Sequence, residues 1–368
     1  MLESLVNKLA CPSCVHPQAK LSVHAFEKGT EGHIRHGVVR CEHCGTAYPI
    51  EDDLLEMVTP ALLAPADYNR FGQRFRGQLK ALGINDQLAA QQPEADLSAQ
   101  LKQREHFDWY ADNEDQTYLD YAKSPFWTAA DELTFARWKT MIQNDTWILD
   151  VGSANGRASW PWLEQPGLKL VGFDISKKLI RQAIEESRKQ GYHGKTTFLV
   201  GDGNCLPFVD QSFDYAMTYG VLHHLPDPGA SLRKIQDILK PGGIFFGSEN
   251  NETVFRSIFD LMMKLSPLWT EEAGTEPLIS RKMLHDWTAE KPVQLQYRTQ
   301  VFLPPHLYNL LGNRLARLAM QLSDCMADWV PGIRHQGGLI VFEILKHRDE
   351  TASWSGRQSA SHTKARAA

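Results

Sequence analysis

The sequence has no long apolar run and no excess of basic charge. No stretch approaches the roughly 18 uninterrupted apolar residues that a membrane-spanning helix needs. The opening residues, MLESLVNKLA, lack the basic flank and apolar run of a secretory signal. With 39 basic and 44 acidic side chains, the formal net charge is -5, which disfavours a protein built to neutralise nucleic-acid phosphates. We therefore expect a cytoplasmic protein without a membrane span, long enough at 368 residues for two or three domains.

Cysteine is also scarce, and its placement is informative. Four of the six cysteines form two C-x-x-C pairs, Cys11 with Cys14 and Cys41 with Cys44, and 26 residues separate the pairs. Two such pairs provide the four soft ligands of a tetrahedral zinc ion. Two disulfides or a redox pair are the alternative, but a reducing compartment disfavours disulfides, and neither pair has a thioredoxin-like context. We predict structural zinc, because four protein ligands leave no position for water or substrate.

The segment around these cysteines resembles a known family. LVNKLACPSC and VVRCEHCGTAYPIEDDLLEM are similar to the small zinc-ribbon protein that activates tRNA, rRNA and translation-factor methyltransferases. The resemblance covers residues 1–60, with Asp53 at a position where that pattern usually has glycine. It implies a ribbon, normally a separate subunit, that is fused here and could dock a protein partner. His33 and His36 lie between the cysteine pairs, and we expect both to be solvated residues of a hairpin tip.

Residues 61–145 are less informative and are predicted to form a helical linker or cap. Pro60 and Pro65 mark its start, and QLAAQQPEADLSAQ reads as a polar connector. A group of aromatic residues precedes the next domain. These side chains either pack a helical cap on the main domain or line a substrate or sulfonium pocket. They are Trp109, Tyr110, Tyr118, Tyr121, Phe126 and Trp127.

From Trp147 onward, apolar strand-like runs alternate with amphipathic helical ones. This alternation predicts an α/β fold with a doubly wound parallel sheet, which binds its ligands at the carboxyl ends of the strands. Polar and glycine residues stand at those predicted ends. Asp150, Gly152 and Gly156 follow the first strand, Asp174 the second, Asp202 the third and Tyr219 the fourth.

The first of these loops, in ILDVGSANGRAS (148–159), does not fit a dinucleotide. A dinucleotide loop has the pattern G-x-G-x-x-G/A, and this chain has Ala154 and Arg157 at the second and third glycine positions. Asp174 can accept hydrogen bonds from ribose hydroxyls, as either cofactor would require. Asp202 adds a second acid placed to accept from an adenine amino group, which a nicotinamide site does not need.

Several motifs in order resemble one family. DVGSANG, GFDIS, GDGNCLPFVDQSFDYAMTYGVLHHLPDP and LKPGGIFFGSEN are similar to class I S-adenosylmethionine-dependent methyltransferases, and within them to the group containing ubiquinone and menaquinone biosynthesis methyltransferases. The resemblance covers residues 146–250 and implies a Rossmann-like sheet of seven strands. Because the family usually has glycine at the place of Ala154, the loop gains one methyl group, and we expect cofactor binding to survive. The implied cofactor-binding residues are Asp150, Gly152, Ala154, Gly156, Asp174, Ile175, Asp202, Gly203 and Tyr219.

Methyl transfer from a sulfonium needs alignment and a dry pocket more than it needs acid–base groups. A base is required only when the acceptor starts protonated. His223 and His224, in VLHHLPDP, are the candidates for that role at neutral pH. The alternative is that they hold the turn between strand and helix.

The rest of the domain, over residues 146–347, is predicted to carry helical inserts at 252–290 and 304–330 and a disordered tail at 348–368. TVFRSIFDLMMKL has an apolar helical face that belongs either to the core or to a lid over the substrate. VQLQYRTQVF and GGLIVFEILK are expected to be antiparallel strands that close the sheet. A second helical pattern lies between them and carries Leu307, Leu310, Leu311, Leu315, Leu318 and Leu322.

Three functions stay open on the sequence alone. The apolar insert and unremarkable charge favour O- or C-methylation of a small-molecule acceptor. The ribbon favours an rRNA or tRNA methyltransferase, but residues 1–60 carry five Lys or Arg against eight Asp or Glu, which disfavours an RNA grip. A non-catalytic scaffold is the third, and the intact Asp174 and Asp202 count against it.

Overall fold

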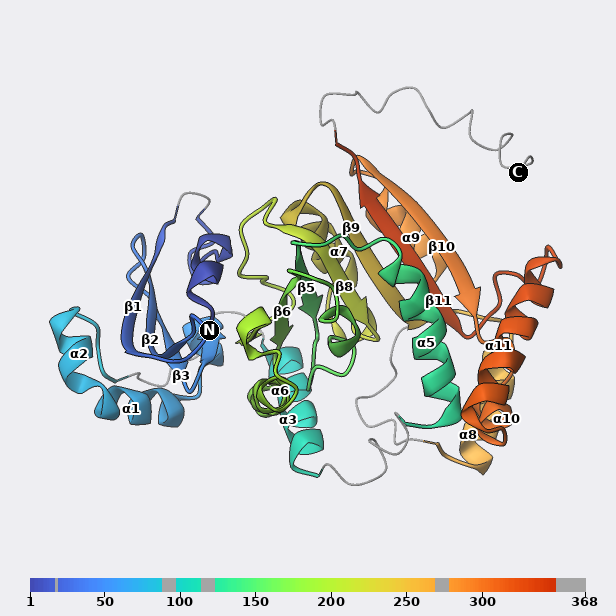
Figure 1. The fold of residues 1–368 in the computed structure, drawn as a ribbon, viewed down its shortest axis with the longest axis horizontal. Helices are drawn as coiled ribbons and strands as arrows, with labels where there is room; N and C mark the ends of the chain where they lie inside the picture. Colours follow the sequence, from blue (N-terminus) through green and yellow to red (C-terminus); the bar gives the residue numbers. More distant parts are fainter. Residues whose placement is uncertain (17–18, 88–96, 114–122, 269–277, 349–368) are drawn as a thin grey trace.

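One mixed sheet runs through the molecule. The computed structural model describes residues 1–16, 19–87, 97–113, 123–268 and 278–348 (Figure 1). Its eleven strands are hydrogen-bonded in the order β1-β2-β3-β4-β7-β6-β5-β8-β9-β11-β10. The strands are β1 (Leu21–Lys28), β2 (Ile34–Cys41), β3 (Ala47–Glu51), β4 (Leu54–Met57), β5 (Trp147–Val151), β6 (Lys169–Asp174), β7 (Thr196–Gly201), β8 (Phe213–Tyr219), β9 (Leu239–Asn250), β10 (Val293–Gln300) and β11 (Leu339–Lys346).

The central strands are parallel, as the alternating pattern predicts. β5 pairs in parallel with β6 and β8, and β6 and β8 pair in parallel with β7 and β9. β11 runs antiparallel to β9, and β10 pairs antiparallel with β11 at the outer edge. The prediction that these two segments are antiparallel strands closing the sheet is therefore confirmed. The carboxyl ends of β5, β6, β7 and β8 meet along one edge, where the candidate site residues follow.

Helices cover both faces of this central part, which makes it doubly wound. The helices are α1 (Pro65–Arg74), α2 (Arg76–Ala81), α3 (Ser98–Asp112), α5 (Pro125–Lys139), α6 (Lys177–Lys189), α7 (Pro228–Ile238), α8 (Arg256–Leu265), α9 (Arg281–Thr288), α10 (Pro305–Asn309) and α11 (Asn313–Asp328). Trp138 of α5 and Ile180 of α6 share one buried cluster with Ile148 and Leu170 of the sheet. Leu232 of α7 and Leu284 of α9 belong to the cluster on the opposite face.

The prediction of a seven-stranded sheet beside a separate ribbon is wrong. The four ribbon strands form an antiparallel meander, and its last strand, β4, pairs in parallel with β7 through Leu55 and Leu199. Seven strands remain from β7 to β10, and the ribbon adds four at the β7 edge. An edge strand presents unpaired backbone groups, and the sequence pattern of LLEM gives no sign that it would pair with a strand so distant in sequence.

The helices that follow the ribbon pack back on it. Phe71, Phe75 and Leu79, from α1 to α2, form a buried cluster with Val38 of β2. Figure 1 shows both helices beside the ribbon strands. The expectation that His33 and His36 are solvated is wrong as well, because both side chains are buried. Of the predicted aromatic group, Tyr118 and Tyr121 lie outside the described residues.

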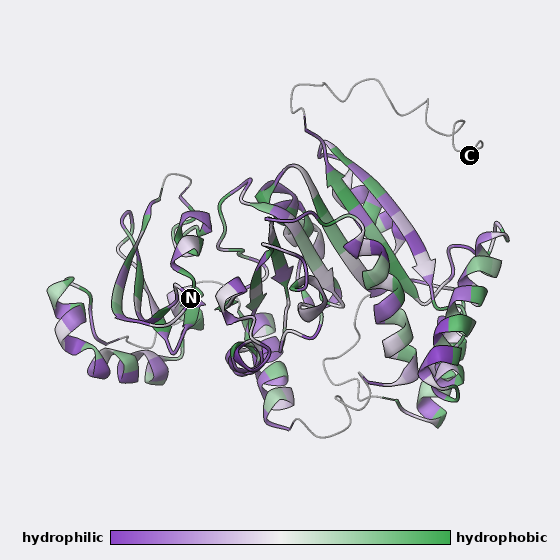
Figure 2. Cartoon of the chain, viewed as in Figure 1, coloured by the Kyte–Doolittle hydropathy of each residue, from purple (hydrophilic) through white to green (hydrophobic). Residues whose placement is uncertain are grey.

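The C-terminal helices are amphipathic, but their leucine-rich sides are not core. α8 has no buried residue, and Ile258 is 55% exposed, so the core interpretation of TVFRSIFDLMMKL is wrong. On α11 the buried positions are Ala316, Met320 and Ala327, whereas Leu315 and Leu318 are exposed. Figure 2 shows hydrophobic and hydrophilic positions mixed along the C-terminal helices. Among the described residues, no helix is both long and apolar enough to cross a membrane.

Candidate functional site

The loop after β5 makes the floor of a pocket at the edge where the parallel strands end. Gly152 has φ +75°, and a Cβ there would lie 2.4 Å from a methyl carbon of Val221, so the loop requires glycine at this point. Ala154 also adopts a left-handed conformation, with φ +47°. Its backbone N–H donates to Asp174 Oδ2 at 2.9 Å, which ties the loop after β5 to the end of β6.

Asp174 ends β6 and is almost fully buried. Its Oδ1 accepts from the backbone N–H of Ser176 at 2.9 Å, and burial raises the pKa of the carboxyl to about 6. Asp150 lies one layer below, where it accepts from the Ser159 hydroxyl at 2.5 Å, and burial raises its pKa to about 7. A carboxylate shielded from water in this way interacts strongly with any hydroxyl donor that reaches it.

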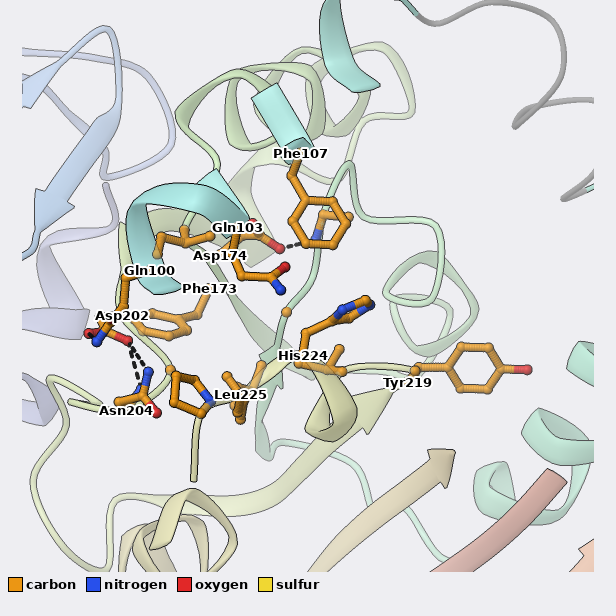
Figure 3. A pocket seen from close by; sticks show the side chains of 18 residues that line it. Gln100, Gln103, Phe107, Phe173, Asp174, Asp202, Asn204, Tyr219, His224 and Leu225 are labelled. Carbon is orange, nitrogen blue, oxygen red and sulfur yellow. Dashed lines mark hydrogen bonds between the residues drawn. The ribbon is translucent and has the colours of Figure 1, made fainter. Parts of the chain in front are cut away.

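Asp202 follows β7 and faces the same pocket (Figure 3). Its Oδ1 accepts from the backbone N–H and the side-chain amide of Asn204, both at 2.8 Å. Its Oδ2 is 3.5 Å from the Gln100 side-chain nitrogen, at the limit of a hydrogen bond. Oδ1 of Asp202 is therefore already hydrogen-bonded within the turn, whereas Oδ2 can accept a stronger hydrogen bond from a ligand.

Helix α3 covers the pocket, and sequence reasoning missed its contribution. Gln100, Gln103 and Phe107 project from it into the cavity (Figure 3). The helix is anchored to the domain because the Ser176 hydroxyl donates to Asp108 at 2.6 Å and Arg104 donates to the backbone oxygen of Leu62 at 2.6 Å. Gln100, Gln103 and Phe107 are three to four residues apart, so they share one face of the helix. The segment QLKQREHF is mostly polar, so its sequence does not single out these three side chains as pocket residues.

The pocket brings most of the predicted cofactor residues together. Gly152, Ala154, Asp174, Ile175, Asp202, Gly203 and Tyr219 line it, together with His224. Asp150, Gly156 and His223 do not. The Tyr219 side chain points away from the cavity (Figure 3), and its hydroxyl donates to Asp131 at 2.5 Å. Further lining residues that the sequence did not single out are Val151, Phe173, Asn204, Gly220, Val221, Leu225 and Pro226.

The two adjacent histidines have different surroundings. His223 is buried, and its Nδ1 lies 2.7 Å from Glu249 Oε2, while Glu249 Oε1 accepts from the backbone N–H groups of Val221 and Leu222. His223 and Glu249 thus fasten the turn after β8 to β9. The His224 ring faces the cavity instead, edge-on to Phe107 with ring centroids 5.3 Å apart (Figure 3).

The four paired cysteines form a second candidate site, in the ribbon. Their sulfurs lie within 4.8 Å of one another, with Cys11 3.7 Å from Cys44 and Cys14 3.8 Å from Cys41. A tetrahedron with Zn–S bonds of 2.3 Å has an edge of about 3.8 Å, so the spacing fits zinc. The Tyr48 hydroxyl lies 3.0 Å from the Cys11 sulfur and can donate to a thiolate there.

The first cysteine pair is seated against the loop that follows Asp202. The backbone N–H of Ala10 donates to the Pro207 oxygen, and that of Val209 donates to the Lys8 oxygen, both at 2.9 Å. The Cys205 thiol donates to the Pro12 oxygen at 3.5 Å. The ribbon therefore supports one wall of the pocket directly.

Comparisons with known proteins match both parts of the chain. Residues 142–291 match the methyltransferase domain family, and residues 3–53 match the Trm112p-like protein family. Similar curated proteins are the methyltransferase GfsG of Streptomyces halstedii (30% identical; 26% of this chain, 34% of that protein), the ubiquinone biosynthesis O-methyltransferase of Caulobacter vibrioides (33%; 29% and 42%) and the demethylmenaquinone methyltransferase of Corynebacterium kroppenstedtii (29%; 35% and 55%). The chain thus spans less than two thirds of each of these relatives.

Two solved structures are also similar. One is the Haloferax volcanii Trm112 methyltransferase activator in complex with a protein described as a methyltransferase (19% identical, TM-score 0.46, 66% of this chain and 97% of that chain). The other is the YcgJ protein of Bacillus subtilis (17%, TM-score 0.45, 59% and 100%). Residues 142–291 are therefore similar to the methyltransferase domain family, and in part to the ubiquinone and menaquinone biosynthesis enzymes, and they follow a region, residues 3–53, that is similar to Trm112p-like proteins.

Proposed function

We propose that this protein is an S-adenosylmethionine-dependent methyltransferase that acts on a small-molecule acceptor by O- or C-methylation. The observation that carries the proposal is the pocket in which Asp174 and Asp202 stand at the ends of adjacent strands under the cover of α3. The relatives named for ubiquinone and menaquinone biosynthesis support an acceptor of this size. Because α3 covers the pocket, a small acceptor that enters as a whole molecule suits the pocket better than one segment of a large RNA does.

The residues of the pocket suit this cofactor. S-adenosylmethionine would supply a methyl group on a positively charged sulfur. The Asp174 carboxylate accepts from backbone N–H groups and keeps lone-pair capacity to accept from the ribose hydroxyls. Asp202 Oδ2 can accept from the adenine amino group. The methyl group of Ala154 lies in the loop, and the apolar side chains of Phe107 and Leu225 line the pocket and help to exclude water from it.

His224 is the residue we propose as the proton acceptor, if the substrate is a hydroxyl. Its ring lines the pocket, whereas the His223 ring is held by Glu249. A general base must reach the proton that it removes, and only His224 of the two has that access. His223 then acts as a positioning residue, which keeps the turn and its neighbour in place.

The ribbon surface argues against RNA as the substrate. Of its five basic residues, four have partners within the chain: Lys8 donates to the Ser212 oxygen, Arg40 donates to the Leu82 oxygen, and Lys28 and Arg35 pair with Glu3 and Glu27. A charge already paired releases few counterions on meeting a phosphate. We therefore propose that the ribbon, residues 1–60, holds a structural Zn²⁺ and stabilises the cofactor pocket.

The division of the chain follows from these roles. Residues 61–145 supply the helices that cover the ribbon and the pocket, and residues 146–347 form the catalytic domain. In Figure 1, α8 of the first predicted insert (252–290) and α10 and α11 of the second (304–330) lie together at the outer side of the molecule, whereas α9 packs on the sheet through Leu284. We propose that the α8 insert contributes to acceptor choice, because its apolar face is exposed and follows β9 directly.

The proposal is tested by following labelled methyl. Purified, zinc-loaded protein and radiolabelled S-adenosylmethionine are added to a lysate of source cells that lack this protein, and the products are split into an organic extract and an RNA fraction. Label in the organic extract, lost with Asp202→Asn, is the expected result. Label in RNA would overturn the small-molecule acceptor, and no label in any fraction, with no cofactor binding, would favour the scaffold.

A further inference from the structure

Three side chains that the proposed reaction does not use meet where the ribbon joins the catalytic domain. His33 precedes β2, Asp53 lies in the turn between β3 and β4, and His193 begins a short 3-10 helix, His193–Lys195, before β7. All three are buried, and one ligand atom from each lies within 4.8 Å of the other two. The two imidazole rings stack with their centroids 3.8 Å apart.

The hydrogen bonding of His33 leaves one ring nitrogen ready for a cation. Its Nε2 is 2.9 Å from the backbone oxygen of His193. A carbonyl oxygen only accepts, so Nε2 carries the proton and Nδ1 carries the lone pair. That Nδ1 is buried without a hydrogen-bond partner. Histidines that bind metals regularly donate their other ring N–H to a backbone carbonyl in this way, which fixes the tautomer and the direction of the ring.

Asp53 offers a second atom of the same kind. Arg188 donates to its Oδ2, and His193 Nε2 lies 3.4 Å from that oxygen. Its Oδ1 is buried and has no partner. Two buried acceptors in one cluster, neither with a donor, are costly, and a cation between them satisfies both. Arg188 on the outer oxygen matches the hydrogen bond that a ligating carboxylate usually receives.

The backbone at Asp53 gives an independent reason to look for a role. Asp52 and Asp53 have φ +50° and +70°, the conformation of a two-residue hairpin turn in which glycine is preferred at the second position. An aspartate there carries a strain that glycine would avoid, and such strain gathers at functional positions. In exchange for this strain, the chain has a carboxylate at position 53, which glycine could not provide.

We propose that His33 Nδ1, Asp53 Oδ1 and a ring nitrogen of His193 bind a divalent transition-metal cation such as Zn²⁺, apart from the cysteine cluster. Two imidazoles and one carboxylate are a ligand set that suits zinc. A further acid, Glu31, lies beside Gly194, where its carboxylate oxygen would be 3.2 Å from an added Cβ. The ion would have two ligands from the ribbon and one from the segment before β7. It would therefore cross-link the ribbon to the catalytic domain.

The metal content of the full chain tests this proposal without any assay of methyl transfer. The protein is equilibrated with excess Zn²⁺, dialysed, and its zinc per chain is measured by mass spectrometry. We expect two zinc ions per chain in the wild type and one in Asp53→Gly and in His33→Gln. Asp52→Gly is the matched control, because it removes a carboxylate at the neighbouring position of the same turn, and it should retain two.

Cobalt gives a second readout. Co²⁺ added to chain whose cysteine cluster already holds zinc should produce weak visible bands without thiolate charge transfer, and these bands should be absent in both variants. Circular dichroism shows whether each variant is folded. One zinc ion in the wild type would overturn the proposal and leave Asp53 as an ion-pair partner of Arg188. Two zinc ions retained in both folded variants would also overturn it, because the second ion would then lie elsewhere.

Discussion

The ribbon cluster and the cofactor pocket handle buried polar groups in opposite ways. In the ribbon, four thiols converge at the spacing of a tetrahedral ion, so a bound metal would satisfy all of them at once. At the pocket, burial raises the pKa of Asp174, which lines it, to about 6, and burial raises the pKa of Asp150, which lies behind the lining, to about 7. We expect a bound metal to stabilise the ribbon, whereas at the pocket the burial of carboxyls costs stability even though hydrogen bonds hold them.

The contacts between the two regions explain why they lie together. The first cysteine pair rests on the loop that carries Asp202 and Gly203, and β4 extends the sheet beside β7. We expect metal binding to stabilise the ribbon, and buried carboxyls to destabilise the domain that carries the pocket. The contacts between them therefore join a stabilised region to one whose function lowers stability. Five substitutions test this contrast, and they are given in order of expected effect.

Cys41→Ser should have the largest effect. Losing one of four ligands removes most of the affinity for the metal, and with it folding free energy on the order of 4 kcal/mol or more. Thermal unfolding followed by circular dichroism, with zinc content measured in parallel, checks this. Cys325→Ser is the control, because that thiol is exposed and outside the cluster, and it should change little. A metal-free Cys41→Ser protein with unchanged melting would contradict the structural role of zinc.

Asp174→Asn should weaken cofactor binding by about 100-fold and yet stabilise the ligand-free protein, by about 1–3 kcal/mol at pH 8. The folded-state pKa of Asp174 is raised from 3.8 to about 6, so the wild type loses stability relative to the variant as pH rises through that interval. At pH 4 the two proteins should unfold nearly alike. Cofactor affinity of the wild type should fall as pH drops below about 6, since the carboxyl takes up a proton. Denaturant unfolding gives the unfolding free energy of both proteins at pH 4 and pH 8, and calorimetry gives their cofactor affinity at the same two pH values.

Substitutions of the two histidines should have different effects, one on stability and the other on the rate of methyl transfer. His223→Gln should destabilise the protein by about 1–3 kcal/mol, because it removes the partner of the buried Glu249. His224→Gln should leave the melting temperature almost unchanged but lower kcat for a hydroxyl acceptor. Equal effects of both variants on melting and on kcat would contradict the assignment of separate roles.

Ala154→Gly should have the smallest effect. Ala154 sits at φ +47°, where glycine avoids the strain, so the unfolding free energy should rise by up to about 1 kcal/mol. Cofactor affinity should stay within about threefold, since the backbone N–H that Asp174 accepts is retained. A large loss of affinity would show that the alanine methyl group itself contacts the cofactor.

The alternation of strands and helices along the chain, and the residues that follow the strands, could be read from the sequence. Buried parallel strands are nearly continuous apolar runs, and Asp174 and Asp202 follow such runs directly, so their place at one edge of the sheet was predictable. The cysteine spacing likewise indicates a shared metal without any knowledge of the fold. These features depend on residues close together in the sequence or on a regular alternation of elements.

The remaining features depend on contacts between distant segments. The pairing of β4 with β7 joins Leu55 to Leu199, and no local pattern specifies it. α3 became part of the pocket because Asp108 and Arg104 anchor it, although its sequence reads as a solvated helix. The burial of His33 follows from the same joint, since its partner His193 lies far along the chain.

The most direct test of the account is calorimetric titration of S-adenosylmethionine into the zinc-loaded full chain at pH 8. We expect one site per chain with a dissociation constant in the micromolar range, and binding weakened by about 100-fold in Asp174→Asn, which should remain folded. Absence of binding to the folded wild type, or equal binding to both proteins, would contradict the claim that this pocket holds the cofactor.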